Sequence, residues 1–378
     1  MTLVWFDLAT PADDPALRRI LRTAMPGTIA LSFEREPCYF QAAALEGPFH
    51  QTMVGRASCD GAVVGMGSRG VRLRMVNGKP MPVGAMSLLR VDPAFAWGAA
   101  LPKVLSAGFG FYRQLHADGR TPFYLVSILE GNRAAERLLA AGLPGWPRLR
   151  PLGRWLTFAL PVGRPRPIPP LPPGWQLEPA RPEWLGEIAD CLARAAAQRQ
   201  LAPLWQPGDL ASPAHTPGLS IEDFWVVRRG DEVAGCAARW DQQAYKQTVV
   251  RGYSRALRWA RPLVNLQARL RGAPPLPPVG GRVRHTFLSC LAVAPGDPAW
   301  ARQASAALLA AVYNAASAAG DHYLMVGLAD GDPLAAHLTR VYRPILLPSR
   351  LYLAHWEDGA SAAAAVDGRP LGVEVALL

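Results

Sequence analysis

The segment Phe123-Tyr-Leu-Val-Ser-Ile-Leu-Glu-Gly-Asn132-Arg-Ala-Ala-Glu-Arg-Leu-Leu-Ala-Ala141 passes from a predicted strand into a predicted helix. Residues 123–129 are rich in aromatic and aliphatic side chains, which favours a strand. Residues 132–141 have the composition of a helix that begins at an asparagine. A similar strand and helix are predicted at 322–328 and 333–342, so the chain contains this unit twice.

The elements around this segment alternate between helices and strands. A short helix comes first, then strands that include a hairpin at 51–74, with a two-residue turn signal at Asn77-Gly78. A second helix leads into the quoted strand. The predicted ranges before and after the quoted segment are 15–25 (helix), 51–58, 63–74 and 82–91 (strands), 102–116 (helix) and 155–160 (closing strand).

The rest of the chain repeats this order with different residues, which indicates an internal duplication of architecture. The predicted ranges are 184–197 (helix), 224–240 (hairpin), 286–293 (strand), 300–318 (helix), 322–328 (strand), 333–342 (helix) and 350–356 (strand), and residues 374–378 can add a last strand. We therefore expect an α/β (α+β) protein with a mixed, mostly antiparallel sheet flanked by helices.

A boundary between two domains is predicted at Pro161–Gly174, where seven prolines block both helix and central strand and favour a stiff, extended connector. The segment could instead be a ligand for a proline-binding module. We predict a first domain at 1–161, a linker at 162–175 and a second domain at 176–378. They are called the first and second halves below.

The formal charge of +11 is unevenly distributed. Residues 1–161 carry 18 basic and 11 acidic side chains, whereas residues 162–378 carry 22 and 18. Nine of those 22 basic residues lie in the segment 242–284, which contains no acid. The remainder of the second half is therefore acidic, and we predict that 242–284 is a basic insertion.

Composition excludes several classes of protein. The five cysteines are scattered without a C-x-x-C pair, and the seven histidines lack metal-ligand spacing, so no metal site is predicted. The apolar runs are far shorter than the roughly 20 residues that span a bilayer. We expect a cytoplasmic protein of bacterial type.

The order of elements and several local sequences resemble those of the GNAT N-acetyltransferases. Ser87-Leu-Leu-Arg-Val-Asp-Pro93 resembles the end of the strand that, in this family, parts from its neighbour and pairs with the pantetheine arm of acyl-CoA. Ala94–Leu101 resembles the pyrophosphate loop in position, although it lacks the arginine and keeps only Gly98. The corresponding loop of the second half, Val293–Leu309, lacks a pair of glycines.

The helix of the quoted segment resembles the family motif N-x-x-A-x-x-L-Y through Asn132, Ala135 and Leu138. Leu139 stands where the tyrosine that protonates the departing thiolate would be. In the second half, Asp332 replaces the asparagine and Thr339 the tyrosine. The resemblance implies two tandem GNAT-type folds.

The function that this resemblance implies is CoA-dependent N-acyl transfer, from acetyl-CoA or a longer acyl-CoA to a small-molecule or peptide amine. The first half would bind the acyl-CoA, and the second would shape the acceptor site. The alternative is a catalytically degenerate protein that binds acyl-CoA, or a protein or membrane partner, without turnover. The implied cofactor-binding residues are Leu89, Val91, Trp97, Gly98, Ala99 and Asn132.

Attack by an amine also needs a base and an N–H that holds the thioester carbonyl. The candidate N–H lies near Leu89 to Val91. Glu34 and Glu36 flank Arg35 on a predicted loop after the first helix, where they could serve as bases or form a solvated ion pair. Glu130 follows a strand end and could reach the amine or cap a helix.

The candidate substrate-binding residues of the second half are His285 and Ser289, on the strand before the long helix. Cys290 follows Ser289, and because side chains alternate along a strand, only one of these two can face the cleft. The insertion adds Arg255 and Arg258, which share one helical face with other arginines. Three interpretations of this face remain open. It could bind an anionic membrane or an acidic partner, its arginines could pair with acids of the same domain, or they could contact an acidic substrate or a CoA phosphate. No motif supports nucleic-acid binding.

Overall fold

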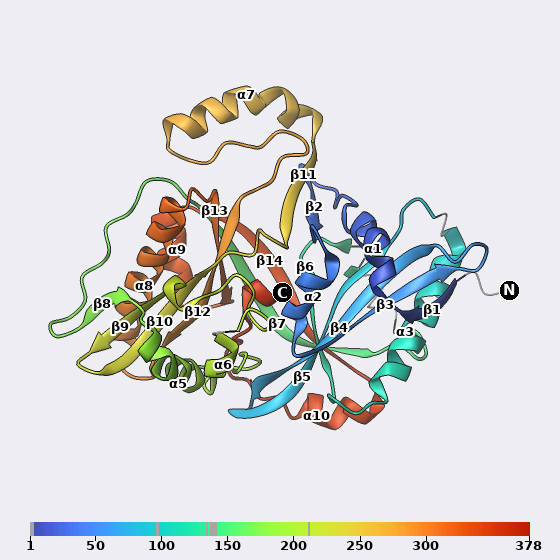
Figure 1. Cartoon of the computed structure of the whole chain (residues 1–378), viewed down its shortest axis with the longest axis horizontal. Coiled ribbons are helices and arrows are strands. Elements are labelled where there is room, and N and C mark those ends of the chain that lie inside the picture. The colour runs from blue at the N-terminus through green and yellow to red at the C-terminus, as the bar shows by residue number, and fades with distance from the viewer. Residues whose placement is uncertain (1–3, 96–97, 134, 137–141, 211) are drawn as a thin grey trace.

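A computed structural model of the chain describes residues 4–95, 98–133, 135–136, 142–210 and 212–378 (Figure 1). The first half forms strands and helices in the predicted order, with one additional strand at its start and another after α1. Its elements are β1 (Val4–Leu8), α1 (Asp14–Leu21), β2 (Ile29–Glu34), α2 (Tyr39–Ala43), β3 (Phe49–Ala57), β4 (Val63–Val76), β5 (Lys79–Val91), α3 (Leu101–His116), β6 (Tyr124–Leu129) and β7 (Arg148–Pro161).

The second half follows a connector without helix or strand. Its strands are β8 (Gln176–Pro179), β9 (Phe224–Arg229), β10 (Glu232–Trp240), β11 (Gln247–Tyr253), β12 (His285–Val293), β13 (Tyr323–Ala329) and β14 (Ile345–His355). Its helices are α5 (Leu185–Ala196), α6 (Pro207–Leu210), α7 (Arg255–Leu270), α8 (Pro298–Ala318), α9 (Leu334–Tyr342) and α10 (Ala360–Ala364).

One twelve-stranded sheet runs through both halves in the order β1-β3-β4-β5-β6-β14-β7-β13-β12-β10-β9-β8. The order is symmetric about its centre, except that the last strands are exchanged. β14, from the end of the chain, pairs antiparallel with β6 of the first half, and β7 pairs antiparallel with β13 of the second. The two exchanged strands also pair with each other from Ile345↔Ala159 to His355↔Arg148. Each half therefore completes its sheet with a strand from the other.

Most pairs in the sheet are antiparallel, as predicted, and only β5–β6 and β12–β13 are parallel. Alternate residues of each strand face opposite helices. On β9, Val226 packs in the core beneath α5, whereas Val227 packs against α8. On β3, Val54 packs against α1 and α2, whereas Met53 packs against α3. Both faces of the sheet are thus covered by helices.

Two details correct or limit the sequence predictions. Residues 374–378 do not add a strand: Glu374 accepts a hydrogen bond from the backbone N–H of Ala376 and begins a 3₁₀ turn, Val375–Leu377. The helix predicted at 132–141 lies largely outside the described residues. The turn at Asn77-Gly78 is confirmed, with positive φ at both residues.

The proline-rich connector lies along α8. The backbone N–H of Gly163 donates to the Tyr313 hydroxyl at 2.9 Å, and that of Arg166 donates to the Asn314 side chain at 2.8 Å. These contacts hold the connector against the second half.

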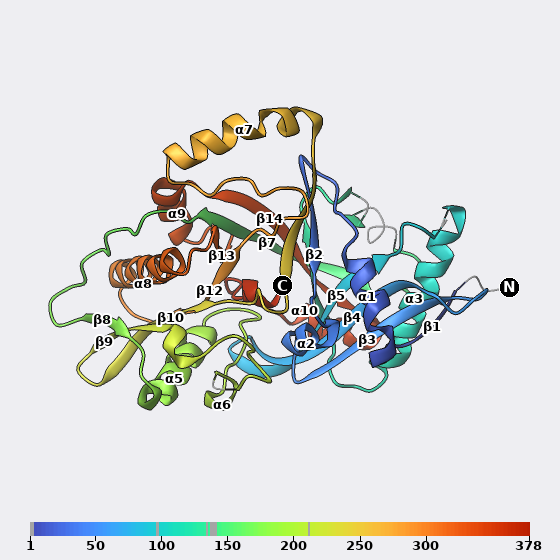
Figure 2. The same ribbon diagram turned by 45° about the horizontal axis from the view of Figure 1, so that its top comes forward.

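The basic insertion forms an arm rather than a cover packed on the sheet. β11 pairs antiparallel with β2 of the first half, from Gln247↔Glu34 to Tyr253↔Ile29, and the two strands form a separate ribbon. α7 follows at the end of this ribbon and stands away from the large sheet in both views (Figures 1 and 2).

Candidate functional site

The parallel strands β5 and β6 pair only at Gly84↔Tyr124 and Ala85↔Leu125, and then part. We call the region beyond Ala85 the first split. Next to it, β5 contains a bulge, because Leu88 and Leu89 together oppose the single residue Gly67 of β4. Leu88 has φ +54°, a left-handed conformation that is unusual for a side chain branched at Cγ.

The second half repeats this geometry. β12 and β13 pair from His285↔Tyr323 to Phe287↔Met325 and then part, which defines the second split. Its bulge places Cys290 and Leu291 opposite Ala237, and Cys290 also has φ +54°. The backbone has the same conformation at corresponding positions, so both halves contain the same structural feature, a pair of parallel strands that part beside a bulge.

The second split is partly filled by the end of the chain. The backbone N–H of Cys290 donates to the Glu374 carboxylate at 3.0 Å. Val375 approaches β13 so closely that a Cβ on Gly327 would lie 2.7 Å from the Val375 Cβ. A cleft of about 450 Å³ remains between this tail, the loop after β12 and the start of α8. Burial raises the pKa of Glu374 above its ordinary value, despite the hydrogen bond from Cys290.

The predicted cofactor residues lie along the first split and at the start of α3. Leu89 and Val91 are on β5, and the Leu89 side chain is 40% exposed. Gly98, with φ +43°, and Ala99 form the 3₁₀ turn that leads into α3. Asn132 accepts a hydrogen bond from the Ala135 N–H at 3.2 Å, as a helix-capping residue does. Trp97 and Leu139 lie outside the described residues.

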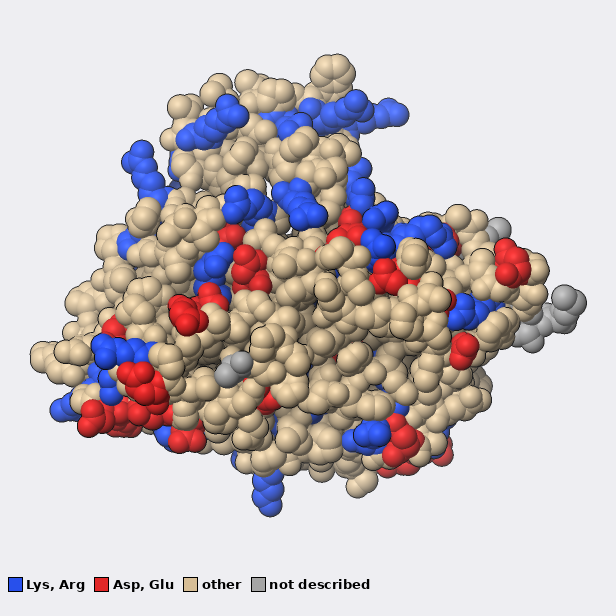
Figure 3. Space-filling view, viewed as in Figure 1, with Lys and Arg blue, Asp and Glu red and all other residues tan. Residues whose placement is uncertain are grey.

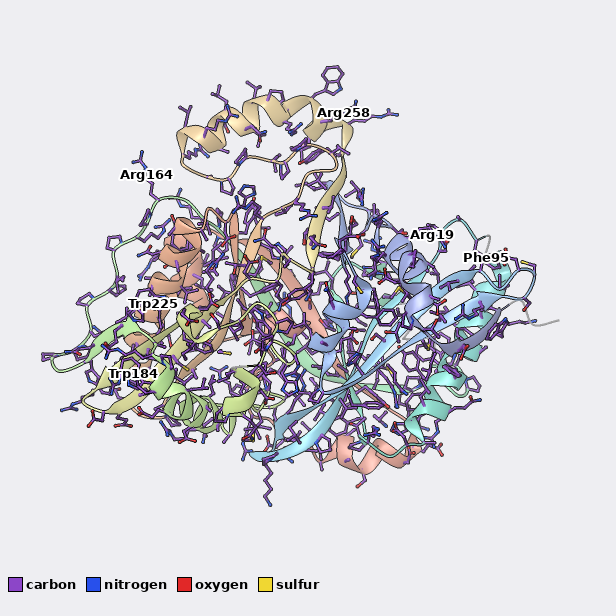
Figure 4. The ribbon with its side chains drawn as sticks, in the orientation of Figure 1. Arg19, Phe95, Arg164, Trp184, Trp225 and Arg258 are labelled. Atoms are coloured by element: carbon purple, nitrogen blue, oxygen red, sulfur yellow. The ribbon has the colours of Figure 1, made fainter. Side chains whose placement is uncertain are left out.

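An arginine from another element lies beside Asp92, where the loop into α3 begins. Arg19 of α1 forms an ion pair with Asp92 at the end of β5 and donates to the carbonyl of Val63 at 3.1 Å. The Phe95 N–H donates to the Asp92 carbonyl at 3.2 Å. Arg19 and Phe95 lie at the same end of the first half in Figure 4. Arg19 is half exposed, so its guanidinium is also accessible to an anion.

Two of the predicted catalytic carboxylates, Glu34 and Glu36, are held by arginines. Glu34 was predicted to lie on a loop, but it is the last residue of β2. There it is buried and contacts the Ser32 hydroxyl and Arg251 of β11. Glu36 accepts hydrogen bonds from Arg18 and Arg22. Partial burial would raise the pKa of Glu36, but these arginines lower it below its ordinary value. Glu36 is therefore a weak base.

The third carboxylate, Glu130, follows β6 but faces away from the first split. It accepts a hydrogen bond from Arg154 of β7 at 2.9 Å and lies 3.5 Å from Arg350 of β14. The hydrogen bond from Arg154 lowers the pKa of Glu130 below its ordinary value. The structure therefore does not bring Glu34, Glu36 and Glu130 together.

A carboxylate that no sequence motif marks, Glu46, lies beside the first bulge, and its side chain is only 9% exposed. It forms a hydrogen bond with the Ser68 hydroxyl and lies 3.4 Å from the hydroxyl of Ser87, the residue before Leu88. Arg35 donates to Glu46 at 2.8 Å. Glu46 belongs to no motif, and only the packing of its short 3₁₀ turn, Ala44–Glu46, against β4 places it here.

Lys246, before β11, was also missed. Its ammonium group donates to the backbone carbonyls of Ala376 at 3.3 Å and Leu378 at 3.5 Å, so it holds the tail between the two halves. Burial and the nearby Arg35 lower the pKa of Lys246 to about 8. Val375 and Ala376 of the tail share a hydrophobic cluster with Ala42 of α2.

The predicted substrate residues do not form one cluster. The His285 ring nitrogen lies 3.0 Å from the carbonyl of Val283, and burial lowers its pKa. Ser289 and Cys290 are both buried, because helices cover both faces of the sheet; the bulge at Cys290 also interrupts the alternation on which the prediction relied. Arg255 and Arg258 lie on the exposed side of α7, and Arg258 points away from the body (Figure 4).

The residues that the structure describes contain no group of three or more histidine, cysteine or acidic side chains that could hold a metal ion. No helix among them is both long and apolar enough to cross a membrane.

The parted strands with their bulge, and the helices that follow them, define a fold: the chain has the fold of the GNAT N-acetyltransferases. A GCN5-related N-acetyltransferase from Sphaerobacter thermophilus is similar over 93% of this chain and 96% of its own, with a TM-score of 0.54 and 14% identity. N-myristoyltransferase from Saccharomyces cerevisiae, with bound myristoyl-CoA, is similar over 94% and 83%, with a TM-score of 0.60 and 12% identity.

A third solved structure is a tandem GNAT protein from the clavulanic acid biosynthesis pathway. It is similar over 93% of this chain and 98% of its own, with a TM-score of 0.57 and 12% identity. No protein-family model and no curated protein sequence matches the chain. At these identities the similarity establishes the fold alone.

Proposed function

We propose that the chain is a CoA-dependent N-acyltransferase, made of two GNAT-like domains at 1–161 and 176–378, that binds acetyl-CoA or a longer acyl-CoA in the first split. The observation that carries this proposal is the bulge at Leu88, beside strands that part after Ala85. A parted strand leaves backbone groups free to pair with an extended ligand. The first half is favoured over the second because the tail occupies the bulge of the second.

The Leu88 bulge is suited to hold the thioester carbonyl. At the corresponding bulge of the second half, the N–H of Cys290 binds a carboxylate oxygen that comes from outside the sheet. An N–H aimed in this way stabilises the negative charge that develops on the carbonyl oxygen during acyl transfer. The pyrophosphate would lie at the turn formed by Gly98 and Ala99, near Arg19, where backbone N–H groups at the start of α3 favour an anion.

The acceptor in this proposal is a small-molecule or peptide amine that enters between the two halves. His285 and Ser289 of the second half would shape its site from below the arm, and a cytoplasmic location would supply acyl-CoA. Asn132 would mark the far side of the first split. Trp97 would bind the cofactor because of its position in the sequence between β5 and α3.

Replacing Leu88 by proline is expected to weaken acyl-CoA binding at least about 100-fold, because proline has no N–H and fixes φ near −65°. Leu88→Gly keeps the N–H and tolerates positive φ, so it is the matched control and should bind as the wild type does. Titration calorimetry with acetyl-CoA and longer acyl-CoAs measures both.

A second variant guards against misfolding of Leu88→Pro. Leu89 is 40% exposed, so Leu89→Trp should fold, yet it would fill the first split and weaken binding about 30-fold or more, which corresponds to about 2 kcal/mol. If the wild-type protein binds no acyl-CoA, the proposed function is wrong. If Leu89→Trp binds as tightly as the wild type, acyl-CoA does not lie in the first split.

We also propose that Glu46 accepts the proton of the amine, because it is the carboxylate beside the first bulge. Glu46→Gln keeps most of its hydrogen bonds but cannot accept a proton at neutral pH. Its rate of thiol release is expected to fall about 100-fold, with unchanged acyl-CoA affinity. Release of free CoA thiol and calorimetry measure the two quantities.

The other carboxylates provide the comparison. Glu34→Gln, Glu36→Gln and Glu130→Gln are expected to leave thiol release within a few-fold of the wild type, because their hydrogen-bond partners lie away from the Leu88 bulge, whereas Glu46 lies beside it. A large loss of turnover in one of these variants, with Glu46→Gln unaffected, would instead assign the base to that residue.

A second candidate function is binding of acyl-CoA, or of a protein or membrane partner, without turnover. Leu139 and Thr339 stand at the positions of the family tyrosine, and the tail of the chain lies in the second split. Tight binding of acyl-CoA without thiol release in the presence of varied amines would favour this function.

A further inference from the structure

The helix α7 is an exposed platform held in one orientation. Among its 16 residues, none is buried. The loop that returns beneath it fixes its inner side: the Asn265 side chain accepts from the N–H of Leu276 at 2.8 Å and donates to its carbonyl at 3.1 Å. Arg261 donates to the same carbonyl at 3.2 Å. These hydrogen bonds fix the rotation of α7 about its axis, so the same side of the helix always points away from the rest of the protein (Figure 2).

That outer face is apolar along its centre. Its large side chains recur at spacings of four, three and four residues, so they form one stripe. They are Trp259 (86% exposed), Leu263 (68%), Leu266 (55%) and Leu270 (80%). A helix on the surface of a globular protein normally turns such a stripe toward the core. A continuous exposed apolar stripe indicates an interaction site.

Arginines flank the stripe. Arg255, Arg258 and Arg269 are exposed, and none of them forms an ion pair with any residue that the structure describes. The whole segment 242–284 carries nine basic residues and no acid. In Figure 3 the arm shows Lys and Arg side chains among uncharged ones, with no Asp or Glu on the visible face. The arm is therefore complementary to a negatively charged surface.

We propose that α7 binds the surface of an anionic lipid bilayer, lying parallel to it. Trp259 and the three leucines would enter the boundary between headgroups and acyl chains, and the flanking arginines would contact lipid phosphates. A bilayer satisfies both features at once. A nucleic acid would pair with the arginines but leave the leucines in water. A helix about 24 Å long offers less than the ~800 Å² per partner that a stable protein interface buries.

This proposal is independent of the acyl transfer proposed above, since it uses no residue of either split. It is tested by sedimentation of the full chain with vesicles of phosphatidylcholine that contain phosphatidylglycerol, beside vesicles of phosphatidylcholine alone. The protein is expected to sediment with the anionic vesicles at low salt, and far less with neutral vesicles or at high salt.

The contribution of charge is measured with Arg255, Arg258 and Arg269 replaced together by glutamine. Each arginine near an anionic surface contributes about fivefold to affinity, so the variant should bind about 100-fold more weakly. The matched control replaces Arg148, Arg302 and Arg340, three exposed arginines elsewhere, and loses the same net charge. The control is expected to bind within about threefold of the wild type.

The contribution of the stripe is measured with Trp259→Ser, Leu263→Ser and Leu266→Ser combined. Binding to anionic vesicles should fall at least about tenfold, because each large apolar side chain contributes to insertion. Leu73→Ser, at an exposed leucine of β4, is the control. Because α7 buries no residue, all variants should unfold at the temperature of the wild type, which thermal unfolding verifies.

Three outcomes would overturn the proposal. The first is no sedimentation with anionic vesicles at low salt. The second is an equal loss of binding in the matched control variants. The third is a wild-type oligomer that the stripe variant abolishes while vesicle binding is unchanged, because the stripe would then bind a second copy of the chain.

Discussion

Expressed separately, residues 1–161 and 162–378 are expected not to fold into stable units. The fragment 1–161 lacks β14, which pairs with β6 from Ser349↔Leu129 to Ala354↔Tyr124. Its own β7 in turn loses β13 and β14. Each fragment would expose a long strand edge and the apolar side chains that the exchanged strand buries, such as Leu351, Leu353 and Leu160.

The expected effect is large because each fully buried side chain of this kind contributes about 1.5–3 kcal/mol, and several are lost together. Sums of this size match the whole stability of a typical domain, about 5–15 kcal/mol. We expect neither fragment alone to show a cooperative unfolding transition by circular dichroism, whereas the two mixed together should regain one.

A full chain cleaved within the exposed connector is the matched control. Cleavage between Arg164 and Pro172 breaks no strand, so the nicked protein should remain folded, with both pieces in one complex. A fragment that unfolds cooperatively on its own, with a midpoint near that of the intact chain, would show that the exchanged strands are dispensable.

Replacing Arg69 by methionine is expected to lower the free energy of unfolding by about 3 kcal/mol, because its buried guanidinium donates to three partners. Arg69 is 1% exposed. It forms an ion pair with Asp118 and donates to Gln51 at 2.7 Å and to the Tyr124 hydroxyl at 3.1 Å. Tyr124 pairs with Gly84 where β5 and β6 still run together, so this network also fixes the closed end of the first split. Removal of Arg69 leaves Gln51 without this donor, whereas Asp118 keeps its ion pair with Arg120 and Tyr124 keeps its hydrogen bond with His116.

Arg120 offers a matched control on the same carboxylate. It lies 3.3 Å from Asp118 and over the ring of Phe49, as Arg69 does, but its side chain is 52% exposed. Arg120→Met should therefore cost less than about 1 kcal/mol. Urea unfolding of the three proteins measures the difference. If both variants lost the same free energy of unfolding, burial would not explain the contribution of Arg69 to stability.

The sequence predicted helices and strands correctly where hydrophobic periodicity or a turn-forming residue marked them. The hairpin of β9 and β10, the helix α8 and the turn at Asn77-Gly78 all follow from local patterns. The short strands β2 and β8 were missed because four to six residues carry little periodicity. Residues 374–378 were expected to be able to add a last strand, but Glu374 caps a 3₁₀ helix there instead.

Prediction of the site was weaker for a different reason. Leu88 and Cys290 gave no signal, because a left-handed bulge at a leucine or cysteine depends on how β5 and β12 pair with their neighbours. Glu46 lies in no motif. Glu36 and Glu130 were chosen for their positions along the chain, but arginines distant in sequence, such as Arg18 and Arg154, pair with them and lower their pKa values.

By itself, the sequence determined the order of elements, the repeated strand–helix unit and the basic insertion, because these depend on neighbouring residues, and its resemblance to the GNAT family implied the fold. The tertiary structure alone decided the exchange of β7 and β14, the two splits with their bulges, the tail against Cys290 and the outward stripe of α7. Each of these depends on which residues meet across the fold. Pairings between strands about 200 residues apart in sequence, such as that of Arg148 with His355, have no local energetic signature.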